Sequence, residues 1–209
     1  MSTSYFDQSA ATWDNEPRRI ALMKAVGEAI LREAQPSKDT DVLDYGCGTG
    51  LVSLFLLPHV RSVTGADNSP GMLEVLNKKI TEGGIGNMKV VRLNLEEDRL
   101  PEERYHLIVT SMTMHHVADT ARVLRAFHGL LHAEGKLCVA DLDIEPGVFH
   151  PPEAAGSVHH HGFDRESLKG QLRAADFTKM HDVTAHTVYK PIEGTGERAF
   201  PVFLITAAW

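Results

Sequence analysis

Short apolar runs alternate along the chain with longer segments in which apolar residues recur every three or four positions. The runs are typical of buried strands, and the recurring spacing is typical of helices with one apolar face. The predicted strands span residues 42–45, 62–66, 88–93, 106–111 and 136–142. The predicted helices span about residues 16–33, 51–57, 70–82, 120–132 and 164–175. Because strands and helices alternate, the pattern predicts an α/β fold with a parallel sheet.

The pattern changes after the fifth predicted strand. Residues 144–162 contain several Pro and Gly residues and little periodicity, so we expect a long loop, which in a compact domain is usually functional or disordered. Farther on, residues 183–189 and 199–207 flank a segment with Pro and Gly and are predicted to form a hairpin. The sequence contains no evident repeat or linker, so residues 1–209 are expected to form a single domain.

Composition indicates how large the core can be, in which compartment the protein resides and which partners are disfavoured. Its 209 residues, 43% of them apolar, are enough for a substantial core. No apolar run approaches membrane-spanning length and the N-terminal residues lack a secretion pattern, so we expect a cytoplasmic protein. Cys47 and Cys138 are interpreted as free thiols in a reducing compartment, with a disulfide as the alternative. A net charge of −7 without a basic run disfavours a nucleic-acid partner.

The most informative segment is residues 42–50, Val-Leu-Asp-Tyr-Gly-Cys-Gly-Thr-Gly, in which a strand leads through a turn into a helix. Its glycines stand at alternate positions, Gly46, Gly48 and Gly50. Such a turn at a helix N-terminus lets a nucleoside-bearing ligand approach the backbone. The dinucleotide fingerprint G-x-G-x-x-G is not matched, because Leu51 stands where its third glycine belongs. Asp44 would repel phosphates and attract a cation, so the predicted ligand is a positively charged nucleoside.

This segment resembles motif I of the class I S-adenosylmethionine-dependent methyltransferases. Asp67, at the end of the next apolar strand, matches the ribose-binding acid of that family, and residues 105–117 and 131–141 resemble the motifs around its fourth and fifth strands. The resemblance covers about residues 40–209. It implies a Rossmann-like, doubly wound sheet with helices on both faces, mostly parallel but with an antiparallel last strand.

The resemblance also implies how S-adenosylmethionine, the methyl donor, would be held. The backbone of residues 46–50 would pass beneath its amino acid tail, and Asp44 would interact with its ammonium group, directly or through water. Asp67 would accept hydrogen bonds from both ribose hydroxyls. The alternatives are a plain tight turn for the glycines and a helix cap ahead of Pro70 for Asp67.

The adenine contacts are expected at the ends of the second and third strands. Asn94 and Leu95 stand where the family often carries an acid and a small residue, and an amide can hydrogen-bond to an adenine edge. Glu96 is the alternative contact. Asn68 and Met72 would flank the adenine face, although Met72 is equally suited to the core.

Candidate acceptor-side residues follow the fourth predicted strand. Ser111 is expected at the carboxyl edge of the sheet, where open α/β sheets bind ligands, and His115 and His116 come next. A histidine there would take a proton from a hydroxyl or thiol nucleophile. The alternative is that one of these histidines hydrogen-bonds to the backbone and orders its loop.

The histidines of the long loop raise the question of a metal site. Three consecutive residues, His159 to His161, cannot all face one ion, and with His150 they lack the spacing of helical metal pairs. No metal site is therefore predicted. His161 is the candidate for lining the acceptor pocket and taking part in catalysis, and the others are expected at the surface.

The N-terminal segment, residues 1–37, is expected to act as an arm and helix that cap the site. Tyr5 or Trp13 would provide an aromatic face for the sulfonium, or would simply pack the arm onto the domain. Together with residues 144–162, which serve as a lid loop, this segment would close the site.

The sequence thus predicts methyl transfer from S-adenosylmethionine to a small-molecule acceptor by in-line displacement. One rival is a nicotinamide-dependent oxidoreductase, which Asp44 and Leu51 oppose. The other is a non-catalytic donor-binding module or accessory subunit on the same scaffold. The acceptor atom and the oligomeric state are left open.

Overall fold

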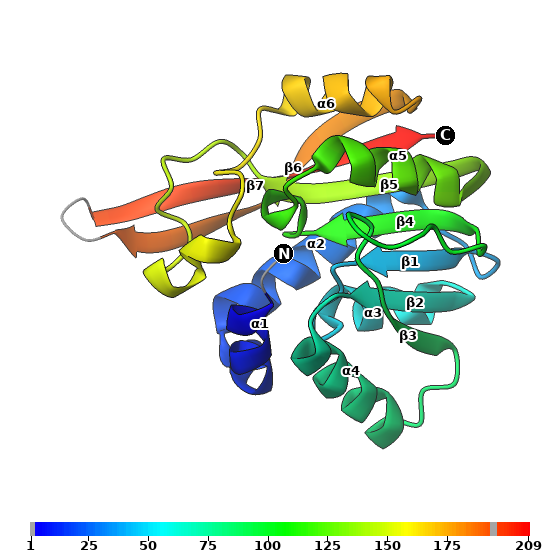
Figure 1. Cartoon of the computed structure of the whole chain (residues 1–209), viewed down its shortest axis with the longest axis horizontal. Coiled ribbons are helices and arrows are strands. Elements are labelled where there is room, and N and C mark those ends of the chain that lie inside the picture. The colour runs from blue at the N-terminus through cyan, green and yellow to red at the C-terminus, as the bar shows by residue number, and fades with distance from the viewer. Residues whose placement is uncertain (1–2, 193–195) are drawn as a thin grey trace.

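The computed structural model describes residues 3–192 and 196–209 and contains a seven-stranded sheet in the order β3-β2-β1-β4-β5-β7-β6 (Figure 1). The strands are β1 Asp41–Tyr45, β2 Ser62–Asp67, β3 Met88–Arg92, β4 Tyr105–Ser111, β5 Leu131–Leu142, β6 Thr178–Ile192 and β7 Gly196–Ala208. Strands β1 to β5 are parallel, whereas β7 runs antiparallel to both β5 and β6. The predicted Rossmann-like sheet with an antiparallel last strand is confirmed.

Helices cover both faces of the sheet (Figure 1). The α-helices are α1 Ser4–Ser9, α2 Pro17–Ala34, α3 Leu51–Leu56, α4 Pro70–Glu82, α5 Thr120–Leu130 and α6 Arg165–Ala174. The 3-10 helices are η1 Ala10–Asn15, η2 Leu57–His59, η3 Met114–His116 and η4 Pro152–Ser157. Within the described ranges, no helix combines the length and apolar character needed to cross a bilayer.

Alternation along the strands divides the core into two layers. Successive strand residues point to opposite faces, so Val42 packs with α2, α3 and α4, whereas Leu43 packs with α5 and α6. The same division holds for Leu107 and Ile108 of β4. Each face is therefore buried by its own helices, which fixes the sheet between two apolar layers.

Local capping sets where several helices begin. At α6, the Asp164 carboxylate accepts a hydrogen bond from the Ser167 backbone N–H. At α4, the Ser69 hydroxyl accepts a hydrogen bond from the Met72 N–H. These caps place both helix starts within one or two residues of the predicted positions.

The largest differences from the predicted elements occur where pairing or packing overrides a weak local pattern. β5 begins at Leu131, before the predicted start at residue 136, and β6 begins at Thr178 instead of residue 183. Pairing with β4 and β7 accounts for these extensions. The turn of the predicted hairpin includes residues 193–195, which lie outside the described residues.

Chain order creates a crevice at the middle of the sheet. The chain proceeds outward from β1 to β2 and β3, then returns to β4 on the other side of β1. In open α/β sheets, ligands bind outside the carboxyl ends of strands where the order reverses in this way. A ligand site is therefore expected at the carboxyl ends of β1 and β4.

Candidate functional site

A cavity of about 840 Å³ lies at the carboxyl ends of β1, β2 and β4. Its remaining walls come from the N-terminal elements, the start of α2, the end of β6 and residues 147–152. The predicted site residues that line this cavity are Tyr5, Trp13, Asp44, Gly46, Gly48, Asp67, Asn68, Met72, Ser111, His115 and His116. Sequence positions far apart are thus brought to one edge of the sheet.

In the glycine-rich turn, a side chain would clash with neighbouring atoms at Gly46 but would meet open space at Gly48. Gly46 has φ +73°, and an added Cβ would lie 2.2 Å from the Thr113 Oγ1 atom. Gly48 has φ +53°, but the nearest heavy atom to an added Cβ is Met72 Sδ at 3.9 Å. Positive φ angles favour glycine at both positions. The turn therefore presents bare backbone toward the cavity at Gly48.

Asp44 is buried at the end of β1 and still lines the cavity. One of its carboxylate oxygens accepts a 2.5 Å hydrogen bond from the Ser53 hydroxyl. Burial raises the pKa of Asp44 to about 7, and the nearby negative charge of Asp67 adds to this shift. A positively charged ligand in the cavity would favour the ionised form.

Asp67 joins the glycine-rich turn to the start of α4. Its two carboxylate oxygens accept hydrogen bonds from the Gly48 N–H at 2.8 Å and the Ser69 N–H at 2.9 Å. Burial raises the pKa of Asp67, and these backbone donors oppose the rise. The cap of α4 is the hydroxyl of Ser69, so Asp67 itself is not that cap.

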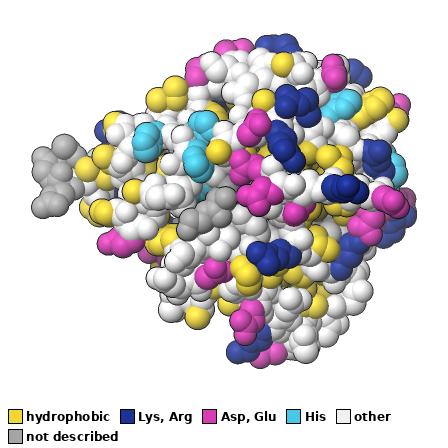
Figure 2. Space-filling model, viewed as in Figure 1, with side chains coloured by type: hydrophobic (Ala, Val, Ile, Leu, Met, Phe, Trp, Pro, Cys, Tyr) yellow, Lys and Arg dark blue, Asp and Glu magenta, His cyan; other side chains and the backbone are white. Residues whose placement is uncertain are grey.

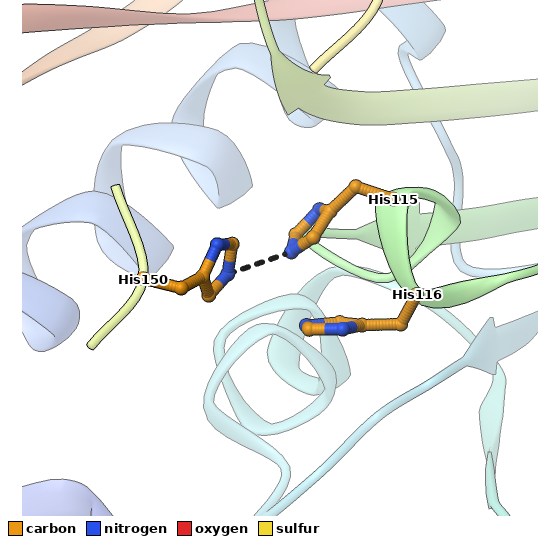
Figure 3. Close-up of side chains that lie close together, drawn as sticks. All are labelled: His115, His116 and His150. Carbon is orange, nitrogen blue, oxygen red and sulfur yellow. Dashed lines mark hydrogen bonds between the residues drawn. The ribbon is translucent and has the colours of Figure 1, made fainter. Parts of the chain in front are cut away.

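Three histidines of the cavity wall lie close together (Figure 3). His115 and His116 lie on η3, and His150 lies in the segment between β5 and η4. His115 Nδ1 is 2.7 Å from Asp141 Oδ1, and its Nε2 is 3.0 Å from His150 Nε2. His116 Nδ1 is 2.7 Å from the Ser157 carbonyl oxygen. One ring nitrogen from each of the three histidines lies within 4.8 Å of the corresponding nitrogens of the other two.

Two of these rings are held in their neutral form. Burial lowers the pKa of His116 to about 3, and the neighbouring His115 contributes to the lowering. Burial likewise lowers the pKa of His150 to about 2, with further contributions from His115 and His116. Neutral imidazoles present unshared nitrogen lone pairs at neutral pH. The cluster can therefore accept hydrogen bonds or bind a cation.

Comparison with known proteins assigns the family. A family model described as a methyltransferase domain matches residues 42–135. An uncharacterized methyltransferase from Schizosaccharomyces pombe is 33% identical, over 85% of this chain and 78% of the relative. The chain belongs to the class I S-adenosylmethionine-dependent methyltransferases. It is accordingly an enzyme of that class.

This methyltransferase is also similar to a second protein in sequence and to a crystal structure in fold. Aklanonic acid methyltransferase DauC from Streptomyces sp. strain C5 is 28% identical, over 72% of this chain and 70% of the relative. The crystal structure of YcgJ from Bacillus subtilis superposes with a TM-score of 0.73 at 15% identity, covering 88% of this chain and 97% of YcgJ. The structural similarity supports the fold alone.

Four predicted site residues of the methyltransferase lie outside the cavity wall: Gly50, Asn94, Leu95 and His161. Gly50 begins α3, and an added Cβ would lie 2.4 Å from a Leu76 methyl carbon, so it serves packing. The Asn94 side chain accepts a hydrogen bond from the Glu96 N–H, and Leu95 is buried in the core. Leu93, at the end of β3, lines the cavity instead.

His150 and Asp141 are the site residues that sequence reasoning missed. The His161 side chain is 62% exposed, and His150 occupies the position in the cavity wall that the prediction gave to His161. Asp141 lies near the carboxyl end of β5, and the strand-end rule applied to Ser111 would have found it. Nothing in the local sequence distinguishes His150 from the other loop histidines.

The N-terminal elements of the methyltransferase are attached to the turn and to α4 by two acids. Asp7 Oδ1 accepts hydrogen bonds from the Ser69 hydroxyl at 2.6 Å and the Gly71 N–H at 2.9 Å. Asp14 accepts a 2.6 Å hydrogen bond from the Thr49 hydroxyl and pairs with Lys79.

The aromatic rings that were predicted to face the sulfonium already pack in part against other side chains. One face of the Trp13 indole is covered by the Arg19 guanidinium, whose central carbon is 3.6 Å from the ring centroid. Tyr5 and Phe6 pack edge-on against one another, and Phe6 also meets the His116 ring at 5.0 Å. Packing thus accounts for much of the aromatic surface at the cavity entrance.

Proposed function

We propose that this methyltransferase transfers a methyl group from S-adenosylmethionine to a small-molecule acceptor by in-line displacement. The observation that carries the proposal is a cavity of about 840 Å³ whose wall contains both the carboxylate pair with the glycine-rich turn and the histidine cluster. S-adenosylmethionine supplies a methyl group on a positively charged sulfur when it is bound. The residues around the cavity bind and orient the two substrates.

The donor is proposed to lie against the turn. Asp67, already fixed by two backbone N–H groups, would accept the ribose hydroxyls, and Asp44 would face the ammonium group. The open space above Gly48 fits a ligand that passes close to backbone, because an added Cβ would enter it. Asn68 and Met72 line the same side of the cavity and would contact the adenine.

The acceptor is proposed to lie beside His115, His116 and His150. Segments 1–37 and 144–162 would cover it, since both contribute to the cavity wall. Orienting acceptor and donor can lower a barrier by about 7–11 kcal/mol at best, so no further catalytic group is needed to explain methyl transfer. We propose one domain, in which these two segments take the place of a separate substrate domain.

Several features support a small acceptor. DauC, a relative by sequence, is named for aklanonic acid. The net charge is −7, and on the face shown in Figure 2 acidic and basic side chains are interspersed, with no extended basic groove. A nucleic-acid acceptor would require a basic surface.

Cys47 and Cys138 are both free thiols, which supports a reducing, cytoplasmic setting.

The donor site is tested with Asp67→Asn. The substitution places an amide where two backbone N–H groups and the ribose hydroxyls need a charged acceptor. Because a hydrogen bond to a charged group contributes about 1.5–3 kcal/mol, donor affinity should fall about 10- to 100-fold by calorimetry. Asp39→Asn, an exposed acid in the loop before β1, is the matched control and should bind like the wild type.

The acceptor class is tested with labelled donor and a fractionated cell extract. Label in small metabolites is the expected result. Label in the nucleic-acid or protein fraction alone would overturn the small-molecule assignment. A folded protein that binds no donor at millimolar concentration would overturn the whole proposal.

A further inference from the structure

We propose that His115, His116 and His150 form a binding site for a divalent transition-metal ion of the Zn²⁺ type. The three residues line the cavity, and one nitrogen from each ring lies within 4.8 Å of the nitrogens offered by the other two. Figure 3 shows the three rings converging from two separate segments. Imidazole is a preferred ligand of Zn²⁺, and three protein ligands with an open fourth position are typical of catalytic zinc sites.

Hydrogen bonds behind two of the rings fix which nitrogen faces the proposed ion. The Ser157 carbonyl can only accept, so His116 Nδ1 carries the proton and donates it over 2.7 Å. His115 Nδ1 donates in the same way to Asp141 Oδ1, also at 2.7 Å. Both rings therefore present the Nε2 lone pair to the cluster. Carboxylate and carbonyl partners of this kind commonly orient metal-binding histidines.

His150 completes the set from the segment between β5 and η4. Its Nε2 lies 3.0 Å from His115 Nε2, so in the absence of an ion His150 donates the N–H of this contact. A metal ion would bind at this Nε2, and the proton of the neutral His150 ring would then lie on Nδ1. Nitrogens bound at about 2.0–2.1 Å to one tetrahedral ion lie about 3.3 Å apart. The 3.0 Å contact is close to that value, and ion binding would require the other separations, which reach up to 4.8 Å, to close by side-chain rotation.

A proton relay is the competing explanation of this cluster. A relay from His150 through His115 to Asp141 would use two rings and one carboxylate. It would give no part to His116, which is buried and has its Nδ1 proton directed away from the other two rings. The close approach of three imidazole rings, each able to offer one nitrogen ligand, is better explained by a shared cation.

The role of the ion rests on the proposed function. Its open position would face the cavity and would take an oxygen or sulfur atom of the acceptor. The site therefore narrows the acceptor to a compound with a hydroxyl, carboxylate or thiol group. The ion would hold that atom beside the donor side of the same cavity.

The experiment measures metal binding without donor or acceptor. Chelator-treated protein is titrated with Zn²⁺ by calorimetry, and with Co²⁺ by visible absorption, which reports coordination geometry. One ion per chain is expected. His150→Ala and His150→Gln should weaken binding at least 100-fold, and Asp141→Asn about 10- to 100-fold. His161→Ala removes an exposed histidine of the same segment and should bind like the wild type.

Circular dichroism and thermal unfolding establish that each variant is folded, and either His150 variant suffices for the test. Binding of Zn²⁺ that is not 1:1, wild-type affinity in both His150 variants, or equal loss in His161→Ala would overturn the site. Asp67→Asn should lose donor affinity and keep Zn²⁺ affinity. Methyl transfer without any Zn²⁺ binding would overturn this inference alone, whereas Zn²⁺ binding without donor binding would overturn the proposed function.

Discussion

Asp44 is a buried carboxyl group that is expected to carry a charge when the donor is bound. It is 1% exposed, and burial raises its pKa from 3.8 to about 7. A carboxylate that is held away from water without a cation favours its protonated form. The residue expected to attract the donor's positive charge therefore destabilises the protein when ionised without a ligand.

The stability of the free protein should depend on pH through this residue. Between pH 4 and pH 7 folded Asp44 holds a proton that the unfolded chain has released, so the free energy of unfolding falls as pH rises through this window. Asp44→Asn cannot ionise and removes this contribution. The variant should exceed the wild type in stability at pH 8 by at most a few kcal/mol.

Urea unfolding at pH 4.5 and pH 8 without donor measures the difference. Glu74→Gln, an exposed carboxyl change on α4, is the control and should follow the wild type. If Asp44→Asn loses as much stability between the two pH values as the wild type does, Asp44 is not the group responsible.

Alanine substitutions at Gly46 and Gly48 should affect different properties, namely stability at Gly46 and donor binding at Gly48. Alanine at Gly46 would place a Cβ 2.2 Å from Thr113 Oγ1 in left-handed backbone, which should cost about 2–5 kcal/mol of stability. Alanine at Gly48 meets no atom closer than 3.9 Å, so strain alone should cost about 1–2 kcal/mol. The Gly48 variant should fold and bind donor poorly, because its methyl group enters the donor's space.

Urea unfolding together with calorimetry tests this pair. Wild-type donor affinity in Gly48→Ala would exclude close passage of the ligand over this backbone. Equal stability of the two variants would show that the Thr113 contact does not restrict the turn.

Among the elements, α1 and η1 are held mainly by side-chain contacts. Of their residues only Ala10 is buried, so they add little to the hydrophobic core and pack through partly exposed rings such as Phe6. Asp7 and Asp14 make the polar attachments, to α4 and to the glycine-rich turn. Because partly exposed pairs contribute about 1 kcal/mol or less, this segment should open more readily than the sheet.

Asp14→Asn should loosen these elements without unfolding the protein. Loss of the pair with Lys79 should raise amide hydrogen exchange within residues 3–15 several-fold and weaken donor affinity modestly. Glu82→Gln, which removes an exposed pair with Lys78 on α4, is the control. Unchanged exchange in the Asp14 variant would show that other contacts hold the segment.

Periodicity predicted the elements that bury a continuous apolar face. α5 is an example, since Val123, Leu124 and Phe127 lie fully buried against the sheet. α1 and η1 could not be predicted in this way, because they have almost no buried residues to create a pattern. The early start of β5 depends on pairing with β4, which local sequence does not record.

At the scale of the whole molecule, the parts of the site that follow strand ends were predictable and those that depend on loop paths were not. Ser111 follows from the rule that parallel strands end at one edge, whereas Asp44 and Asp67 were predicted from the motif I segment and from the acid that ends the second strand. His150 meets His115 across 35 positions of sequence, through a segment with no periodic pattern. Only the folded chain brings that pair together, whereas the sequence prediction chose His161, the loop histidine next to Gly162 and the following helix.

The position of β7 between β5 and β6 has a consequence for biosynthesis. While the ribosome is making residues 143–195, one side of β5 has no neighbour, because β7 must still emerge before it can pair there and before β6 can pair beside it. An open strand edge invites association with other nascent chains. Chaperone protection during this interval of translation should therefore matter more for this protein than for a sheet that is completed in chain order.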